Sequence, residues 1–132
     1  MIANILIAED DSEDIEFFTD ILSSISPATK LSIAVNGVIL MDLLKDAAVL
    51  PDFIFLDLNM PQKNGFECLH EIKSSDVWKS IKTVMLSTSS QPEQIKNVYD
   101  MGADLYIVKP TSFSVYKDSI KKCLEMDWDA LK

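Results

Sequence analysis

Three kinds of polar residue in this sequence have the chemical character needed to hold a phosphoryl group. Glu9, Asp10 and Asp57 are carboxylates, the run Ser87-Thr88-Ser89-Ser90 carries hydroxyls, and Lys109 is a cation. Carboxylate oxygens are the ligands that Mg²⁺ prefers, while an ammonium and a hydroxyl can bind phosphate oxygens. These residue types could therefore support phosphoryl transfer if the fold brought them together.

Asp57 is difficult to explain as a purely structural residue. It follows the apolar run Phe53–Leu56, which predicts a buried strand, and a buried carboxylate is tolerated only with partners. Three carboxylates in one cleft would raise one another's pKa values unless a cation lay among them. We therefore favour a Mg²⁺ site formed by Glu9, Asp10 and Asp57 over a merely acidic pocket.

Other acids near the start of the chain fit a structural role. Acidic residues are dense between positions 9 and 20, and carboxylates favour the first turn of a helix because of its dipole. We assign Glu13, Asp14 and Glu16 to this role. Asp11 or Ser12 is the expected N-cap of the helix.

Short apolar runs alternate with stretches of helical periodicity along the chain. The runs are mostly continuous, as is typical of strands buried on both faces. Ser90 and Glu93 have the spacing of a capping box that would open a helix, and Gly102 would end it. The expected strands are residues 5–8, 31–35, 53–56, 83–86 and 105–108.

Strict alternation of five strands and five helices predicts an α/β fold with a doubly wound parallel sheet. Five strands fit the flavodoxin-like order 2-1-3-4-5, in which ligands bind beyond the carboxyl ends of the first and third strands. The first and last helices should cover one face and the other three helices the opposite face. Cys68 and Cys123 would then lie on opposite faces and form no disulfide. We expect one domain over residues 1–132.

Composition argues against several classes of protein. The chain has 12 lysines, no arginine and 21 acidic residues, for a net charge of −9, whereas a nucleic-acid-binding domain needs a basic face. Apolar runs reach about six residues, short of the ~18–20 of a membrane-spanning helix. Met1–Asn4 lacks the basic residues of a signal peptide, and two isolated cysteines suit a reducing compartment. We expect a cytoplasmic chain that neither binds nucleic acid nor inserts into a membrane.

In their order and spacing, these motifs resemble the receiver domain of two-component response regulators. The resemblance covers the whole chain, and only residues 126–132 follow the last expected helix. The chain is therefore most similar to a stand-alone receiver without an output domain. The matching motifs are Glu9-Asp10, Leu56-Asp57-Leu58-Asn59-Met60-Pro61, Asn64-Gly65, Ser87-Thr88 and Lys109-Pro110.

The resemblance implies that Asp57 is the phosphoacceptor. Its phosphoryl group would come from the phosphohistidine of a histidine kinase or a histidine phosphotransfer protein. Glu9, Asp10, Asp57 and the backbone carbonyl of Asn59 would hold Mg²⁺. The resemblance also implies a regulatory protein that assists its own phosphotransfer and slow dephosphorylation, without being an enzyme in the usual sense.

The resemblance further implies a conformational switch. Ser87 and Lys109 would contact the phosphoryl group, Ser87 and Tyr106 would change position together, and the Lys109–Pro110 peptide bond would be cis. Phosphorylation adds roughly −1.5 to −2 charges and would shift the domain between two conformations. An unidentified protein partner would recognise the surface formed by the helix near 90–101, the strand 105–108 and the last helix.

Alternative functions can be compared on the same residues. A flavodoxin-type carrier would bind FMN at this edge, but the acidic segment Glu9-Asp10-Asp11 would repel its phosphate. A haloacid-dehalogenase-type phosphatase has its Asp-x-Asp after the first strand, whereas Asp57-Leu58-Asn59 follows the third. A receiver-like docking module that is never phosphorylated stays open, although the complete set of polar residues argues against it.

Overall fold

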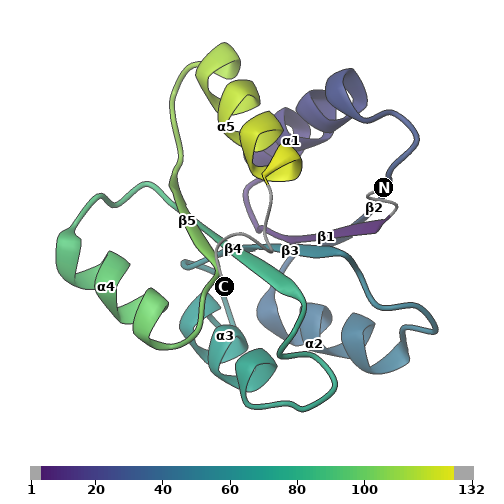
Figure 1. The fold of residues 1–132 in the computed structure, drawn as a ribbon, viewed down its shortest axis with the longest axis vertical. Helices are drawn as coiled ribbons and strands as arrows, with labels where there is room; N and C mark the ends of the chain where they lie inside the picture. The colour runs from purple at the N-terminus through teal and green to yellow at the C-terminus, as the bar shows by residue number, and fades with distance from the viewer. Residues whose placement is uncertain (1–3, 127–132) are drawn as a thin grey trace.

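The structure, a computed structural model, describes residues 4–126 as five strands and five helices in alternation (Figure 1). Residues 1–3 and 127–132 of the expected domain, including most of Met1–Asn4, lie outside the described residues. The strands are β1 (Asn4–Ala8), β2 (Lys30–Ala34), β3 (Phe53–Asp57), β4 (Lys82–Ser87) and β5 (Leu105–Val108). The helices are α1 (Ser12–Ile25), α2 (Gly37–Asp46), α3 (Gly65–Lys73), α4 (Pro92–Asp100) and α5 (Phe113–Glu125).

All strand pairs are parallel, and the sheet order is β2-β1-β3-β4-β5. The predicted fold class and strand order are therefore confirmed. Every residue of β3 is buried, because β3 is the central strand and helices cover both of its faces. The register pairs Asp57 with Leu86 and Ser87 with Val108, so these strands end at nearly the same level.

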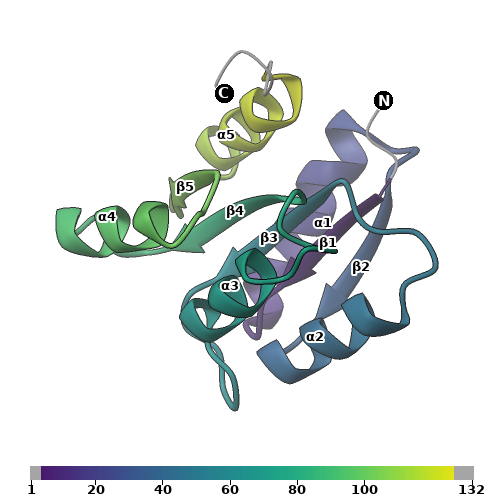
Figure 2. The same cartoon turned by 60° about the horizontal axis from the view of Figure 1, so that its bottom comes forward.

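The two faces of the sheet are covered as predicted (Figures 1 and 2). In Figure 1, α1 and α5 lie on one side of the sheet and α2, α3 and α4 on the other. Phe18 of α1 packs in one apolar core with Cys123 of α5, whereas Leu40 of α2 and Cys68 of α3 belong to the second core. The two cysteines are buried in the cores on opposite faces of the sheet, as predicted, so they form no disulfide with each other.

Local signals set the helix ends. The Asp11 carboxylate accepts backbone hydrogen bonds from Glu13 at 2.9 Å and Asp14 at 3.1 Å, which confirms Asp11 as an N-cap. The predicted capping box of Ser90 and Glu93 was wrong. Helix α4 begins at Pro92, after Gln91, and its N-cap makes no side-chain hydrogen bond. Proline suits the first helical position, since its fixed φ matches the helix and its missing N–H needs no partner.

Helix α1 illustrates how the cores are formed. It buries Phe18, Ile21 and Leu22 against the sheet and presents acids such as Glu13 and Glu16 to solvent. In residues 4–126, no helix combines the length and the apolar character needed to cross a bilayer.

Candidate functional site

The carboxyl ends of four strands bring the predicted site residues to one edge of the sheet. Glu9 follows β1, Asp57 ends β3, Ser87 ends β4 and Lys109 follows β5. Parallel strands point the same way, so residues distant in the chain meet at this edge, where the ligands of doubly wound sheets bind. The structure therefore brings the predicted site residues together at one edge of the sheet, and their role as a site stays a prediction.

Lys109 lies at the centre of a group of carboxylates. Its ammonium donates hydrogen bonds to Glu9, to Asp57 Oδ2 at 3.1 Å and to Asp14 Oδ2 at 3.0 Å. The lysine side chain is only 7% exposed. Burial opposes its charge, but the hydrogen bond to Glu9 and the charges of Asp57 and Glu9 outweigh burial and raise the pKa of Lys109. The site therefore contains a stable positive charge.

Glu9 is the most deeply buried carboxylate of this group, with 1% of its surface exposed. Burial, together with the neighbouring Asp57, raises the pKa of Glu9 to about 9, although Lys109 acts in the opposite direction. A single lysine thus does not fully compensate the buried carboxylates, which is the condition under which a site gains by binding a further cation.

The carboxylates fit a divalent metal ion. Glu9, Asp10 and Asp57 each offer an oxygen, and these three atoms lie within 4.8 Å of one another. Octahedral Mg²⁺ has ligands at 2.0–2.1 Å, so opposite ligands lie about 4.2 Å apart. The three oxygens therefore need only a small adjustment to share one ion. Asn59 lies beside them, since its backbone N–H donates to Asp57 Oδ1 at 3.2 Å; its carbonyl as a ligand stays a prediction.

Gly65, the first residue of α3, fixes the backbone that carries Asp57. Its N–H donates to the Leu58 carbonyl at 3.0 Å. A Cβ atom at Gly65 would lie 2.3 Å from the carbonyl oxygen of Asp57, a distance that no side chain tolerates. The glycine therefore allows α3 to approach the end of β3 and holds the Asp57 loop in place.

Ser87 and Tyr106 are joined by a hydrogen-bond network that includes Gln94 of α4. Ser87 Oγ accepts from the Ser89 backbone N–H at 3.1 Å and from Gln94 Nε2 at 3.3 Å. The same Gln94 nitrogen donates to the Tyr106 hydroxyl at 2.9 Å, and that hydroxyl donates to the Ser89 carbonyl at 2.7 Å. The network connects a side chain at the acidic edge to α4 and β5.

Sequence reasoning missed the contributions of Asp14 and Gln94. Asp14 was assigned to the helix dipole, although it lies in the first turn of a helix that begins at the acidic edge, and this position was an available signal. Nothing in the sequence distinguishes Gln94 from Gln91, because both are glutamines at the start of α4.

The prediction of a cis Lys109–Pro110 bond was wrong. No cis peptide bond occurs in residues 4–126, so this bond is trans. The trans form is favoured by about 0.5–1 kcal/mol for bonds that precede proline, and the Lys109 side chain reaches its carboxylate partners from this backbone.

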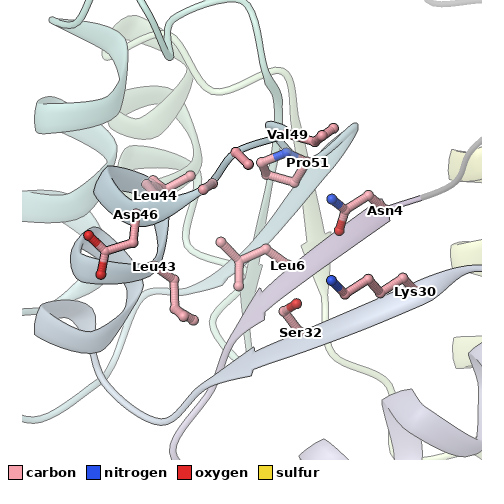
Figure 3. A pocket seen from close by; sticks show the side chains of 11 residues that line it. Asn4, Leu6, Lys30, Ser32, Leu43, Leu44, Asp46, Val49 and Pro51 are labelled. Carbon is pink, nitrogen blue, oxygen red and sulfur yellow. The ribbon is translucent and has the colours of Figure 1, made fainter.

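A pocket of about 370 Å³ lies away from the acidic edge. It is formed where β1 and β2 begin and where α2 ends, and Figure 3 shows Leu6, Leu43, Leu44, Val49 and Pro51 around it. None of the carboxylates around Lys109 lines this pocket. The carboxylates that surround Lys109 therefore lie apart from this cavity.

The chain belongs to the response regulator receiver domain family, since the family model matches residues 5–121. This membership assigns the chain to the regulatory modules of two-component signalling and supports a phosphoacceptor role.

Individual relatives agree with the family assignment. Response regulator Rcp1 from Synechocystis sp. is 31% identical over 110 residues, which cover 80% of this chain and 75% of that protein. The phosphorylated cyanobacterial phytochrome response regulator RcpA has a TM-score of 0.87 and 31% identity, with 100% of this chain and 97% of that chain covered. The Mn²⁺-bound form of Rcp1 has a TM-score of 0.84 and 27% identity, with 96% and 94% covered.

Several curated relatives are longer than this chain. The probable methanogenesis regulatory protein FilR2 of Methanothrix harundinacea is 33% identical over 76 residues, which cover 58% of this chain and 49% of that protein. The chain thus spans about half the length of this relative. Shared sequence therefore concerns the receiver domain, and single-domain organisation of this chain stays a prediction.

Proposed function

We propose that this domain is a phosphorylation-dependent switch in which Asp57 accepts a phosphoryl group in a Mg²⁺-dependent step. The observation that carries the proposal is the environment of Asp57. This buried carboxylate ends the central strand, lies 3.1 Å from the Lys109 ammonium and belongs to a cluster of three carboxylates within 4.8 Å. The chain is similar to RcpA, which is described as phosphorylated, and this similarity supports a phosphoacceptor role. Its similarity to the Mn²⁺-bound form of Rcp1 supports the dependence on a divalent metal ion.

The phosphoryl donor would be a phosphohistidine of a histidine kinase or a histidine phosphotransfer protein. An oxygen of Asp57 attacks phosphorus and forms an O–P bond, while the P–N bond breaks and its electron pair stays on the imidazole nitrogen. Lys109 neutralises the phosphoryl charge, and the Ser87 hydroxyl donates to a phosphoryl oxygen. Bound Mg²⁺, held by Glu9, Asp10 and Asp57, would supply further charge neutralisation.

The output of the switch would be a change in the surface formed by α4, β5 and α5. Ser87 is linked to this surface through Gln94 and Tyr106. Tyr99 and Val108 there are 43% and 40% exposed, which gives a protein partner apolar area to bury. The partner would be a protein, and neither nucleic acid nor a membrane is expected to bind. A cytoplasmic location and slow self-catalysed dephosphorylation belong to the same proposal.

Intact-mass spectrometry after incubation with Mg²⁺ and acetyl phosphate tests this function. Wild type should gain the mass of one phosphoryl group, whereas Asp57→Asn should gain none. Asp118→Asn is the matched control, because Asp118 is an exposed aspartate of α5, and it should be phosphorylated like wild type. A wild-type protein that is folded by circular dichroism yet gains no mass would contradict the proposal and favour a docking module that is never phosphorylated.

A further inference from the structure

The Ser87 hydroxyl has its two acceptor positions filled. A hydroxyl has two lone pairs and one proton, and Ser87 Oγ accepts from Ser89 N–H and Gln94 Nε2. Ser87 is 1% exposed, so water has little access to this oxygen. Ser87 can still donate its own hydroxyl proton. Among residues 4–126, no hydrogen bond is recorded in which Ser87 donates this proton. The hydroxyl is thus arranged as a donor.

The orientation of the Gln94 amide follows from its other partner. The Tyr106 hydroxyl has one proton, and it is used at 2.7 Å on the Ser89 carbonyl, which can only accept. Tyr106 must therefore accept from Gln94, so the amide nitrogen and not the oxygen faces it. The same nitrogen faces Ser87, and its two protons satisfy one hydroxyl each.

We propose that Gln94 is the positioning residue of the switch: its amide nitrogen orients the Ser87 hydroxyl as a donor and couples Ser87 to Tyr106. The role of Ser87 toward a phosphoryl oxygen rests on the proposed function, whereas the coupling to Tyr106 is a property of the unphosphorylated protein. Because Ser87 would donate its own proton to a phosphoryl oxygen, it can keep the hydrogen bond that it accepts from Gln94 during this contact. A displacement of Ser87 is thereby passed through the Gln94 amide to the Tyr106 hydroxyl.

Two glutamines, Gln91 just before α4 and Gln94 in its first turn, give a matched comparison. Gln94→Met retains the length of the side chain and removes both donors. Gln91→Met makes the same chemical change at an exposed position, where the structure records only backbone hydrogen bonds for the glutamine. Gln94→Met should slow phosphorylation by acetyl phosphate about three- to tenfold, the effect of one ordinary hydrogen bond, and Gln91→Met should leave the rate within twofold of wild type.

The Ser87→Ala background separates positioning from a general effect on folding. If Gln94 acts through Ser87, Gln94→Met should change the rate by less than twofold once the hydroxyl is gone, because the two effects are coupled. An equal slowing in both backgrounds would overturn the proposal, as would an unchanged rate for Gln94→Met alone.

A second measurement is independent of phosphorylation. In the unphosphorylated protein, Ser87→Ala should shift the NMR resonances of the Tyr106 ring when Gln94 is present. The same substitution should cause no such shift when it is made in the Gln94→Met variant. An equal shift in both backgrounds would overturn the coupling role even if Asp57 is phosphorylated normally. Conversely, failure of wild type to accept a phosphoryl group would remove the proposed function, whereas the NMR comparison would still decide whether Gln94 couples the two hydroxyls.

Discussion

The Asp14 carboxylate accepts a hydrogen bond from the Lys109 ammonium at 3.0 Å across 95 residues of sequence. Asp14 lies in the first turn of α1, beside the acidic edge, and its side chain is 37% exposed. Burial opposes its charge, but hydrogen bonds to Glu9 and Lys109 lower its pKa. Lys109 is therefore shared among three carboxylates, of which Asp14 belongs to no predicted metal site.

Replacing Asp14 by asparagine should make Lys109 more available to an incoming phosphoryl group. A partly exposed ion pair contributes about 0.2–1 kcal/mol, so phosphorylation by acetyl phosphate should become roughly 1.4- to fivefold faster. The rate is measured by intact mass against time. Glu13→Gln is the control, since it removes the same charge from an exposed neighbour; equal acceleration by both variants would mean that net charge, and not the Lys109 contact, sets the rate.

Removing Lys109 should destabilise the domain. Lys109→Met leaves Glu9 and Asp57 buried without their cation, and breaking a buried ion pair costs about 3–5 kcal/mol. We expect about 2–4 kcal/mol in the free energy of unfolding by urea, because Glu9 can be protonated instead. Lys96→Met is the control: Lys96 pairs with Asp100 at 2.6 Å but is 74% exposed, so its loss should cost less than about 0.5 kcal/mol. Equal losses would refute a special role for the buried lysine.

Mg²⁺ should stabilise the wild-type protein and not the Asp10→Asn variant. A ligand that binds only the folded state adds about 2.7 kcal/mol at a concentration 100 times its dissociation constant. Asp10 is exposed, so its replacement should leave the metal-free stability nearly unchanged while it weakens the binding of the ion. The midpoint of thermal unfolding is measured against MgCl₂ concentration, with Asp20→Asn as the exposed control. Identical Mg²⁺ responses in Asp10→Asn and wild type would contradict the site.

The buried thiol of Cys68 should make the stability fall at alkaline pH. Burial raises the pKa of Cys68 from 9.0 to about 11. The unfolded state therefore loses its thiol proton first, and stability present below pH 9 is lost as the pH rises toward 11, by an amount on the order of 2–3 kcal/mol. Cys68→Ala should flatten this part of the pH profile of urea unfolding. An unchanged slope in the variant would show that other groups cause it.

Local sequence patterns were sufficient for the fold and for placing most of the predicted site residues at one edge of the sheet. Continuous apolar runs indicated buried parallel strands, and all five expected strands exist, with ends that differ by at most one residue from the expectation. The position of Asp57 after Phe53–Leu56 already placed a carboxylate at the end of the central strand. Glu9, Ser87 and Lys109 could be assigned in the same way, because the ends of parallel strands converge whatever the details of packing.

Local patterns were insufficient where several groups compete for one partner. The Ser90 and Glu93 spacing suggested a capping box, but Pro92 set the start of α4 instead. Asp14 had an adequate explanation within its own helix, and only the approach of Lys109 from β5 gave it a second partner. Gln94 differs from Gln91 only because the helix turn directs Gln94 toward Ser87 and Tyr106. Periodicity is a property of consecutive residues, whereas the partner of a side chain depends on elements that become neighbours only when the sheet and its two helical layers have assembled.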